Sequence, residues 1–419
     1  MLRSICVNCA NLSHRLIVAS SANFTADVAD AFDAGDKTSI ALVAGETSGD
    51  LLAGRLLSGL RPLLPEAHMH GIGGAYMAEH GFVSDFAMEK LSVRGLFEVL
   101  AHYREIKGIQ VALRDQLLQE RPAVFIGVDA PDFNLGLEAQ LKSAGIPTMH
   151  FIGPSIWAWR GARIKKIARA VSHMLVIFPF EEEIYRQAGI PATYVGHPLA
   201  QVIPLEPDQS AARLALDLPS GGSVLAILPG SRMSELKYNA VTFIEAARLL
   251  LQRDPDLCLV APMAGLAQRD YFIELLKAAG LQDVPIKIVD GRSHQVLAAA
   301  DAVLVASGTA SLEVALFKKP MVIAYKMMRA SWHVLRHMGY QPWIGLPNIL
   351  AREFLVPELL QDAATPQALA DALWYQLHDA AHREKLKQRF IEMHHTLLRD
   401  TAGESAQAVM QVIAQSKAA

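Results

Sequence analysis

The sequence predicts an α/β protein built from two doubly wound parallel sheets. Short apolar runs such as SIALVA (39–44) and AVFIGV (123–128) are separated by helical stretches, which is typical of parallel strands covered on both faces. The same alternation restarts at SVLAIL (223–228), after the proline-rich crossing VIPLEPDQS. A chain of 419 residues is also too long for one ordinary core. We therefore expect two domains, each with its ligand site beyond the carboxyl ends of its strands.

The expected domain boundaries follow from this restart. Residues 1–38 are polar, rich in small residues and without periodicity, so we expect a disordered leader or a start codon placed too early. The first domain then covers 39–205 and the second covers 206–365. Residues 366–419 repeat apolar residues at helical spacing, which predicts terminal helices that pack back on the N-terminal domain. The remaining predicted strands are 147–152, 173–178, 257–262, 286–290, 302–306 and 321–325.

Composition and charge argue against several classes of protein. The formal net charge is −3, whereas nucleic-acid binding usually leaves a strongly basic footprint, so we expect no nucleic-acid partner. Three cysteines are too few for a disulfide framework and favour a reducing cytoplasm. Cys6 and Cys9 form a C-x-x-C, but no second pair accompanies it. No apolar run reaches the roughly 20 residues that a membrane span needs.

The clearest candidate anion site is the loop LPGSRMSE (228–235), between a predicted strand and a helix expected from about Ser234. Gly230 and Ser231 allow backbone amides to approach a diphosphate, and the helix start adds the positive end of its dipole. Arg232 offers a bidentate fork to the same anion. A tight strand–helix turn with a solvated arginine would give the same residues, so that alternative stays open.

A second loop in the same half has a similar character. SGTASLE (307–313) follows a predicted strand and opens a helix. The small residues Ser307, Gly308 and Thr309 leave room for a phosphate or sugar, and Glu313 is placed to accept hydrogen bonds from a ribose diol. A capped helix start explains the same pattern. Two such loops after strands of one domain favour a nucleotide.

In the first half, AGETSGD (44–50) follows the first strand and opens a helix. Its glycines admit a ligand close to the backbone, while Glu46 and Ser48 offer an acceptor and a hydroxyl. An alternative is a simple helix cap, in which Ser48 or Asp50 bonds the first helical amides. We expect this loop to face the anion loop of the second domain.

The stretch GVDAPDF (127–133) ends a buried strand with two carboxylates and no basic residue nearby in the sequence. We expect Asp129 to follow the strand directly, with Pro131 keeping a helix from starting at once. A carboxylate near a bound nucleotide suits a general base that accepts a proton from a hydroxyl. Asp132 precedes the predicted helix and is interpreted as its cap. We therefore favour Asp129 as the catalytic residue.

Two further patterns are interpreted as structural. GIGGAY (71–76) imitates a dinucleotide fingerprint but lacks its third glycine, so we expect a turn with close backbone approach. The histidines of HMH (68–70) are interpreted as alternating between the faces of a strand, and the pair His394 and His395 lacks carboxylate partners. We find no metal constellation and expect metal-free chemistry.

Basic and aromatic residues cluster in GPSIWAWRGARIKKIARA (153–170). Such a mixture suits an anionic lipid surface, and an ordinary amphipathic helix with a solvated basic side explains it as well. The stretch 88–119 is rich in Leu, Val and Ile with interspersed Arg and Lys. We interpret it either as a pair of core helices or as a surface that touches the membrane.

Several motifs in one order and spacing make the chain resemble a known family, the lipid-A-disaccharide synthases. They are VAGETSGD, GVDAPDFN, GPSIWAWR, FPFEEE, VGHPL, LPGSR, SGTASLE and LPNILA, and the resemblance covers residues 39 to about 415. It implies an inverting glycosyltransferase of the GT-B type, with two Rossmann-like domains facing a cleft and C-terminal helices crossing back. It also implies transfer of 2,3-diacylglucosamine from UDP-2,3-diacylglucosamine to 2,3-diacylglucosamine 1-phosphate (lipid X), which gives the β-1,6-linked disaccharide of lipid A and UDP.

The resemblance further implies the setting of this reaction. The family needs no metal or other cofactor and works in the cytoplasm of Gram-negative bacteria, peripherally on the inner membrane. A homodimer with exchanged C-terminal segments is implied too.

The family's functional residues can be carried over position by position. The catalytic aspartate of G-[IV]-D-A-P-D-F falls on Asp129, and the UDP-binding arginine of P-G-S-R falls on Arg232. The nucleotide-side glutamate of S-G-T-x-x-L-E matches Glu313, and the asparagine of L-P-N matches Asn348. Glu46 matches the acidic residue of the first loop. The expected UDP site is completed by Gly230, Ser231, Ser307, Gly308 and Thr309.

Two departures and two rival functions accompany this resemblance. Arg94 stands where many relatives carry methionine, and the leader 1–38 has no counterpart. A non-hydrolysing UDP-sugar 2-epimerase has a similar two-domain scaffold and would act without a lipid acceptor. A nucleotide-sugar sensor would bind without turnover. Neither rival gives Asp129 an evident purpose.

Overall fold

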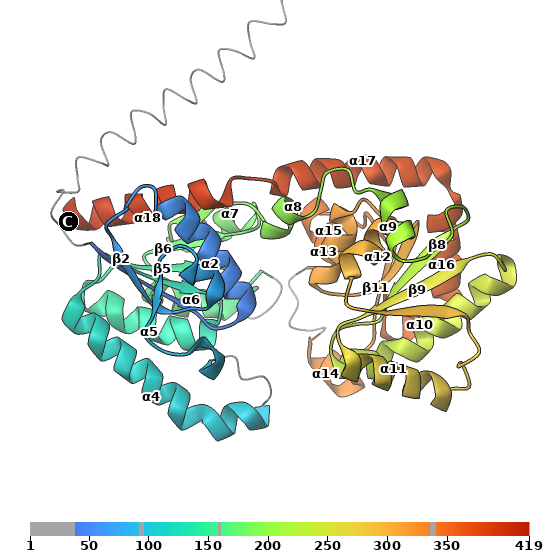
Figure 1. Cartoon of the computed structure of the whole chain (residues 1–419), viewed down its shortest axis with the longest axis horizontal. Helices are drawn as coiled ribbons and strands as arrows, with labels where there is room; N and C mark the ends of the chain where they lie inside the picture. Colours follow the sequence, from blue (N-terminus) through green and yellow to red (C-terminus); the bar gives the residue numbers. More distant parts are fainter. Residues whose placement is uncertain (1–37, 92–95, 158–160, 336–340, 419) are drawn as a thin grey trace, which may run out of the picture. The chain divides into compact units, whose positions relative to one another are not determined.

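The structure is a computed structural model that describes residues 38–91, 96–157, 161–335 and 341–418 (Figure 1). The chain divides into two compact units. The first contains the described residues up to Ile156, those of 162–195 and those from Asp400 on, and the second contains Trp157, Gly161 and the described residues of 196–399. The predicted leader and Arg94 lie outside the described residues.

The first unit is built on a seven-stranded parallel sheet of order β3-β2-β1-β4-β5-β6-β7. Its strands are β1 (Ser39–Ala44), β2 (His68–Ile72), β3 (Val83–Ser84), β4 (Val124–Val128), β5 (Thr148–Phe151), β6 (His173–Val176) and β7 (Ala192–Tyr194). Its helices are α2 (Thr47–Leu60), α3 (Ala75–Ala78), α4 (Leu96–Glu120), α5 (Pro131–Ser143), α6 (Ile164–Ala170), α7 (Glu181–Gln187) and α18 (Thr401–Ala418), with short 3-10 turns at Met88–Lys90 and Gly161–Arg163.

The second unit is built on a six-stranded parallel sheet of order β10-β9-β8-β11-β12-β13. Its strands are β8 (Val224–Leu228), β9 (Cys258–Met263), β10 (Ile286–Asp290), β11 (Ala302–Ala306), β12 (Met321–Tyr325) and β13 (Glu358–Leu360). Its helices are α8 (Pro198–Val202), α9 (Gln209–Ala215), α10 (Met233–Arg253), α11 (Leu266–Ala278), α12 (Ser293–Ala299), α13 (Thr309–Leu316), α14 (Arg329–Leu335), α15 (Leu346–Ala351), α16 (Pro366–His378) and α17 (Ala380–Leu397), with a 3-10 turn at Gln361–Ala363.

Both sheets confirm the predicted α/β class and share one topology. In each, the first strand of the unit lies in the middle, and the chain moves outward on one side before it returns to the other. The strand order therefore reverses between β1 and β4 in the first unit and between β8 and β11 in the second. Ligands of doubly wound sheets bind beyond the carboxyl ends of the strands at this reversal.

The core of the first unit has two layers because the strand residues alternate between faces. Ile40, Leu42 and Ala44 of β1 face the helix α2 and the C-terminal helix α18. Ala41 and Val43 face the other way and pack with the buried residues of α4 and α5. The stretch 88–119, interpreted as a helix pair or a membrane-touching surface, forms a 3-10 turn and then the single helix α4, whose Leu113 and Leu117 are buried in this second layer.

The domain boundaries differ from the prediction at two places. The first unit ends near residue 195 rather than 205, because α8 is tied to α17: the amide of His197 donates to the Leu397 carbonyl (2.9 Å), and His394 Nε2 lies 2.8 Å from the Ala200 carbonyl. Of the terminal helices, α18 belongs to the first unit, where it packs on α2. The helices α16 and α17 belong to the second unit, with α16 packed on α10.

Candidate active site

Two acidic loops lie side by side where the strand order of the first sheet reverses. Strand β1 pairs with β4, and Ala44 stands opposite Val128 at their carboxyl ends. The next residues carry Glu46 and Asp129. The backbones approach so closely that a Cβ on Gly45 would lie 3.0 Å from the Cβ of Ala130. The structure therefore brings the predicted base and the predicted acidic residue of the first loop together.

The environment of Asp129 adjusts its acidity. Burial raises the pKa of the half-buried Asp129 carboxyl, and the nearby negative charge of Glu46 acts in the same direction. The amide of Ala130 and the imidazole of His150 oppose this rise in pKa. A carboxylate that holds a proton more readily than usual is better matched to general-base catalysis near neutral pH.

The backbone at Asp129 is a strained strand–helix elbow. Asp129 and Ala130 have φ of 51° and 43°, in the left-handed region that residues with side chains seldom adopt. Two bonds hold the elbow: the Asp129 amide donates to the Phe151 carbonyl (2.8 Å), and the Asn134 side-chain amide donates to the Asp129 carbonyl (2.8 Å). The chain turns within two residues and presents Asp129 beyond the end of the strand.

Two local predictions about this loop were wrong. Pro131 does not delay the helix but is its first residue, a position where its fixed φ suits a helix and its missing N–H costs no bond. Asp132 does not cap α5 either, because the N-cap residue is Ala130 and makes no side-chain cap bond. The Asp132 side chain is 89% exposed and lies 3.5 Å from Arg163.

A fully buried carboxylate–histidine pair lies beside Gly127 of β4, and the sequence analysis did not predict it. Glu138 of α5 and His150 of β5 are both 0% exposed, and Glu138 Oε1 lies 2.6 Å from His150 Nδ1. Burial raises the pKa of Glu138, while His150 opposes the rise. Gly127 is required beside them, since a Cβ there would lie 2.1 Å from Glu138 Oε1. The signal in the sequence was G-x-D after an apolar run, where the glycine makes room for this pair.

The first helical turn of α2 is organised differently from the prediction. Glu46 is the N-cap residue, and it makes no side-chain cap bond. Ser48 is exposed. Asp50 is 1% exposed and bonds the amides of Gly74 (2.8 Å), Tyr76 (3.1 Å) and Met77 (3.2 Å), so it caps α3 rather than its own helix. The amides of the GIGGAY turn thus bond a carboxylate of the protein itself, which agrees with its interpretation as a structural turn.

The anion loop of the second unit holds an internal carboxylate of its own. Gly230 has φ of 124° and brings the turn back onto Glu235. Glu235 Oε2 accepts the amides of Ser231 (2.9 Å) and Arg232 (3.2 Å), and its other oxygen lies 3.5 Å from the Arg232 guanidinium. The helix α10 begins at Met233, and the Arg232 side chain is 79% exposed. The turn binds a carboxylate in the way the sequence predicts for a phosphate.

The loop after β11 has the open character that the sequence predicts. Gly308, the N-cap residue of α13, has φ of 131°, and a Cβ there would meet nothing within 4 Å. Ser307 and Ser311 each donate to a backbone carbonyl, and Thr309 is exposed. Glu313 is partly buried and lies 3.4 Å from the half-exposed His294 of α12. His294 carries no motif in the sequence, so nothing there pointed to it.

Asn348 is more deeply placed than a ligand contact requires. It is 0% exposed; its side-chain amide donates to the Val356 carbonyl (2.9 Å) and Glu358 (2.8 Å), and its oxygen accepts the Val356 amide (2.9 Å). Glu358 also accepts the amides of Ile344 and Gly345. In this structure Asn348 therefore organises the loop beside β12 and β13, and its direct contact with UDP stays a prediction.

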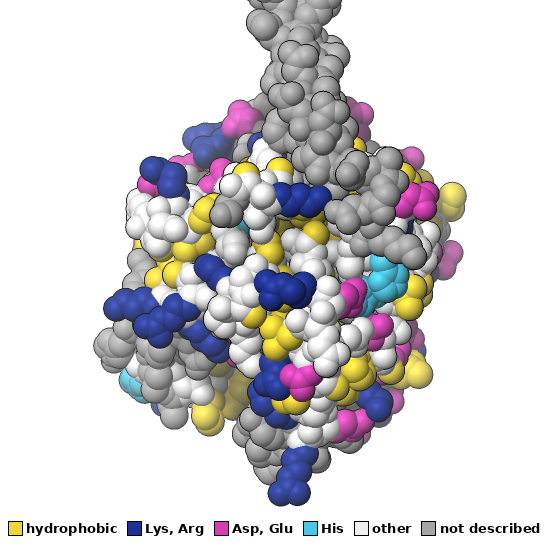
Figure 2. All heavy atoms as spheres, turned by 90° about the vertical axis from the view of Figure 1, so that its left-hand side faces the viewer, with side chains coloured by type: hydrophobic (Ala, Val, Ile, Leu, Met, Phe, Trp, Pro, Cys, Tyr) yellow, Lys and Arg dark blue, Asp and Glu magenta, His cyan; other side chains and the backbone are white. Residues whose placement is uncertain are grey.

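The basic helix α6 was a candidate for contact with a membrane surface. In α6 the residues Ile167 and Ala170 are buried while Lys165, Lys166 and Arg169 are exposed, as in an ordinary amphipathic helix. Figure 2 shows one face of the molecule, on which Lys and Arg side chains are spread among hydrophobic and acidic ones. None of the helices in the described ranges combines the length and low charge that crossing a membrane demands.

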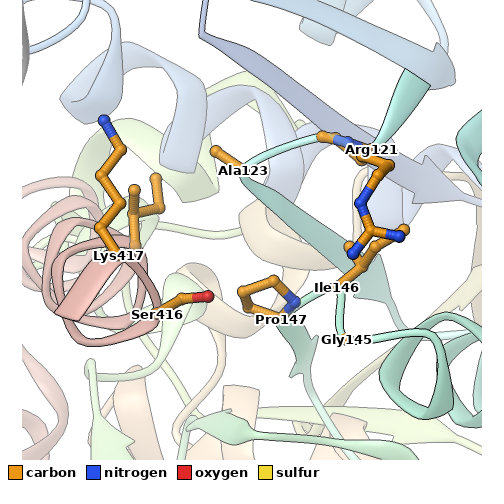
Figure 3. A pocket seen from close by; sticks show the side chains of 9 residues that line it. Arg121, Ala123, Gly145, Ile146, Pro147, Ser416 and Lys417 are labelled. Carbon is orange, nitrogen blue, oxygen red and sulfur yellow. The ribbon is translucent and has the colours of Figure 1, made fainter. Parts of the chain in front are cut away.

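A small surface pocket lies at the opposite end of the first sheet from Asp129. It is found where β4 and β5 begin, against the end of α18 (Figure 3). No residue predicted for the active site lines it. Its lining consists of Arg121, Pro122, Ala123, Gly145, Ile146, Pro147, Ile413, Ser416 and Lys417.

Comparison with solved structures identifies the fold. The chain is similar to the Anabaena protein HepE in complex with UDP and glucose (TM-score 0.53, 17% identity, 92% of this chain and 100% of that one). It is also similar to a putative UDP-N-acetylglucosamine 2-epimerase from Listeria monocytogenes (TM-score 0.58, 12% identity, 89% and 94%). At this identity the likeness concerns the fold, which is the two-sheet GT-B fold of glycosyltransferases.

Sequence comparison is more specific. The family model of lipid-A-disaccharide synthetase matches residues 40–412. The lipid-A-disaccharide synthases of Aromatoleum aromaticum and Albidiferax ferrireducens are 52% and 55% identical to the chain, over 90% and 89% of it and 97% of each relative. The chain belongs to the lipid-A-disaccharide synthase family. It is a glycosyltransferase of lipid A biosynthesis, as the motifs of the sequence predict.

Proposed function

We propose that Asp129 is the general base with which this chain joins UDP-2,3-diacylglucosamine to 2,3-diacylglucosamine 1-phosphate, lipid X. Asp129 takes the proton of the acceptor 6-hydroxyl while that oxygen attacks the anomeric carbon of the donor. The bond from that carbon to the UDP oxygen breaks as the new bond forms on the opposite face, so the configuration inverts. The products are the β-1,6-linked disaccharide 1-phosphate and UDP.

The observation that carries this proposal is the position of Asp129. It stands on a strained elbow beyond β4, beside the strand-order reversal, and burial raises its pKa. Strain of this kind is concentrated at functional sites because a stable fold must hold it in place. The nearby negative charge of Glu46 also raises the pKa of this carboxyl.

The donor is proposed to bind the second unit at its own strand-order reversal. The amides of Ser231 and Arg232 and the guanidinium of Arg232 would receive the diphosphate, and Glu235 would leave them as the phosphate arrives. The open turn with Gly230, Ser307, Gly308 and Thr309 gives the nucleotide room, and Glu313 is the predicted partner of the ribose. Removing one preorganised anion-stabilising donor typically costs 10²–10³ in kcat, so Arg232→Ala is expected to lose about that much.

The experiment combines product analysis with one substitution. Purified protein is incubated with both substrates, and UDP and the disaccharide are followed by mass spectrometry. General acid–base catalysis typically contributes 10²–10⁴-fold, so Asp129→Ala should lower kcat by about that factor while UDP affinity, measured by calorimetry, is nearly unchanged. Asp132→Ala, at an 89% exposed position three residues further from β4, is the matched control and should keep its activity. An active Asp129→Ala would refute the assignment.

The same assay separates the two rival functions. A 2-epimerase would form product from UDP-sugar alone, so a reaction mixture without the lipid acceptor distinguishes it. A sensor would bind UDP without any turnover in either mixture. The family membership favours the transferase, and the epimerase likeness extends only to the fold.

The lipid substrates place the site next to a membrane surface in this proposal. The exposed basic side of α6 suits anionic headgroups, with Lys165, Lys166 and Arg169 as the contributing residues. Peripheral association with the cytoplasmic side of the inner membrane and a homodimer with exchanged C-terminal segments stay predictions.

A further inference from the structure

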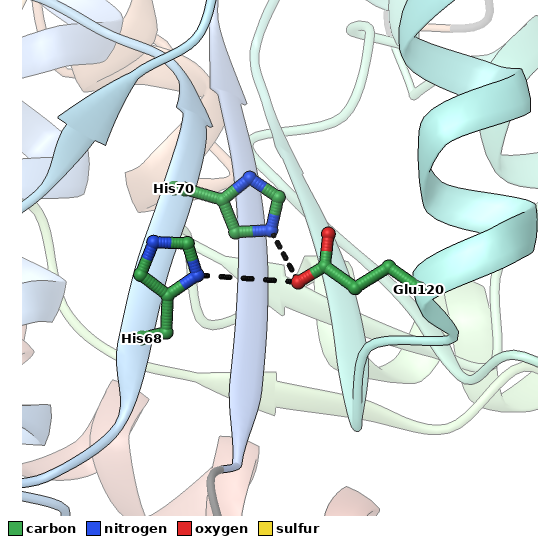
Figure 4. Close-up of side chains that lie close together, drawn as sticks. All are labelled: His68, His70 and Glu120. Carbon is green, nitrogen blue, oxygen red and sulfur yellow. Dashed lines mark ion pairs between the residues drawn. The ribbon is translucent and has the colours of Figure 1, made fainter.

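A histidine–carboxylate cluster lies in the first unit, at the end of the sheet opposite Asp129. His68 and His70 are two residues apart in β2 and so project from the same face, not from alternating faces as the sequence analysis supposed. Their rings stack with centroids 4.7 Å apart. Glu120, the last residue of α4, points at both rings (Figure 4). Its Oε1 lies 3.0 Å from His70 Nε2 and 4.0 Å from His68 Nδ1.

The orientation of His70 is fixed by a second carboxylate. His70 is 1% exposed, and its Nδ1 lies 2.7 Å from Asp85 Oδ2. Because a carboxylate can only accept a hydrogen bond, the Nδ1–H group of His70 donates one to Asp85. In the neutral ring Nε2 then carries a lone pair. That nitrogen makes no hydrogen bond within the described residues, although the Glu120 oxygen is 3.0 Å away.

The Glu120 Oε1 also accepts the hydroxyl of Ser39 (2.5 Å), which does nothing for the His70 lone pair that faces this oxygen at 3.0 Å. A lone pair and a carboxylate oxygen at this distance call for a positive centre between them. A proton would satisfy His70 and Glu120 alone. The second imidazole of His68 favours a metal ion instead, because a ligand atom from each of His68, His70 and Glu120 lies within 4.8 Å of the others. Metal-ligating histidines commonly donate their other N–H to a carboxylate, which is what His70 does toward Asp85.

We propose that His68, His70 and Glu120 bind a divalent transition metal, for which zinc is the best match, and that Asp85 orients His70. Two imidazoles and a carboxylate suit zinc better than calcium or magnesium, which prefer oxygen ligands. The His68 side chain is 57% exposed and Glu120 is 29% exposed, so water can complete the coordination. The ion would join the end of α4 to β2, far along the sheet from Asp129, and would stabilise the unit rather than take part in transfer.

The test titrates zinc chloride into chelator-treated full-length protein and follows binding by calorimetry and melting by scanning calorimetry. We expect one zinc per chain at this site and a rise in melting temperature with zinc concentration. His68→Ala changes an exposed residue and should fold normally, yet lose at least 10-fold in affinity. Asp85→Asn should weaken binding 10–100-fold, as loss of a carboxylate behind a ligand typically does. His80→Ala, in the same unit, is the control and should bind as the parent does.

The C-x-x-C pair of the leader is a competing source of zinc binding, so the titration is repeated in Cys6→Ser/Cys9→Ser. Binding that persists there and is lost in His68→Ala supports the proposal. Cobalt gives a second readout, because its visible absorption reports the ligands directly, and the spectrum should change in His68→Ala. Zinc binding that is absent from the parent protein, or that is equal in the parent, His68→Ala and Asp85→Asn, would overturn the proposal.

Discussion

Two buried histidines, His70 and His150, lie on the same face of the seven-stranded sheet. Each is bonded to a carboxylate, but the carboxylates differ in their exposure to water. His70 of β2 stands beside Ala41, and His150 of β5 stands beside Gly127, so the strand pairing places both toward α4 and α5. Each has its Nδ1 within 2.7 Å of a carboxylate oxygen. Glu138, the partner of His150, is 0% exposed, whereas the two carboxylates around His70 are 20% and 29% exposed.

The difference follows from where each histidine meets the ends of the strands. His150 lies toward the carboxyl end, close enough to Asp129 to affect its pKa, in a layer sealed by α5. His70 instead meets Glu120, the last residue of α4, near the amino ends of the strands, where Glu120 is partly exposed to water. The same pair of residue types therefore lies beside the proposed catalytic carboxylate at one end of the sheet and forms a proposed metal site at the other. Position in the fold decides the role, and residue type alone does not.

The largest effect on stability is expected from removing the fully buried carboxylate of Glu138. Removing one partner of a buried ion pair typically costs 3–5 kcal/mol, because the other is left without compensation, so Glu138→Ala should lower the free energy of unfolding by about that amount. Glu120→Gln changes the partly exposed carboxylate beside His70, and it should cost no more than about 1 kcal/mol in zinc-free buffer. Urea unfolding of both variants checks this. Equal losses would show that the two pairs are not distinguished by burial.

Glu138→Gln separates a positioning role from a structural one. It keeps the shape of the side chain and removes the charge paired with His150, so this pair does less to oppose the rise in the pKa of Asp129. The acid limb of the kcat/KM profile should then move to higher pH, with the KM for UDP-sugar nearly kept. An unshifted profile in a folded variant would leave Glu138 with a structural role alone.

The comparison also shows how far the sequence could predict this molecule. The nine strands predicted from continuous apolar runs are present within about two residues of their predicted bounds, because a strand buried on both faces has a distinctive composition. The short edge strands β3, β7 and β13 have no such run and were missed. Asp129 could be proposed from the sequence because it directly follows a strong strand signal. His150, which acts on the pKa of Asp129, and Glu138, which pairs with His150, lie on two other elements, and only the fold brings them together.

A third buried histidine gives a test of what burial alone does. Burial lowers the pKa of His197, in the second unit, from its ordinary 6.5 to about 4. Between these values the unfolded chain binds a proton that the folded unit does not, so stability is retained above pH 6.5 and lost as the pH falls toward 4. The loss should reach about 3 kcal/mol. Fluorescence of Trp332, Trp343 and Trp374, which all lie in the second unit, follows its unfolding. His197→Gln should remove this part of the acid sensitivity, and an unchanged pH dependence would contradict it.

The smallest effect, opposite in sign, is expected at Asp129 itself. Its folded-state pKa is raised, so the folded unit binds a proton more readily than the unfolded chain, and stability falls as the pH rises from about 3.8 through the raised value. At neutral pH the charged carboxylate therefore costs stability. Asp129→Asn should raise the melting temperature slightly at pH 7 and not at pH 3, while it abolishes most of the transfer activity.

Asp132→Asn, at an exposed position in the same loop, is the control and should leave the melting temperature unchanged. A destabilised Asp129→Asn would mean that the carboxylate stabilises the elbow, and the strain at Asp129 and Ala130 would then need no catalytic explanation. A gain in stability with loss of activity is the result expected of a residue whose charge opposes folding and serves the reaction. At the His70 cluster we expect a gain in stability without loss of activity, because zinc bound there should leave transfer unchanged.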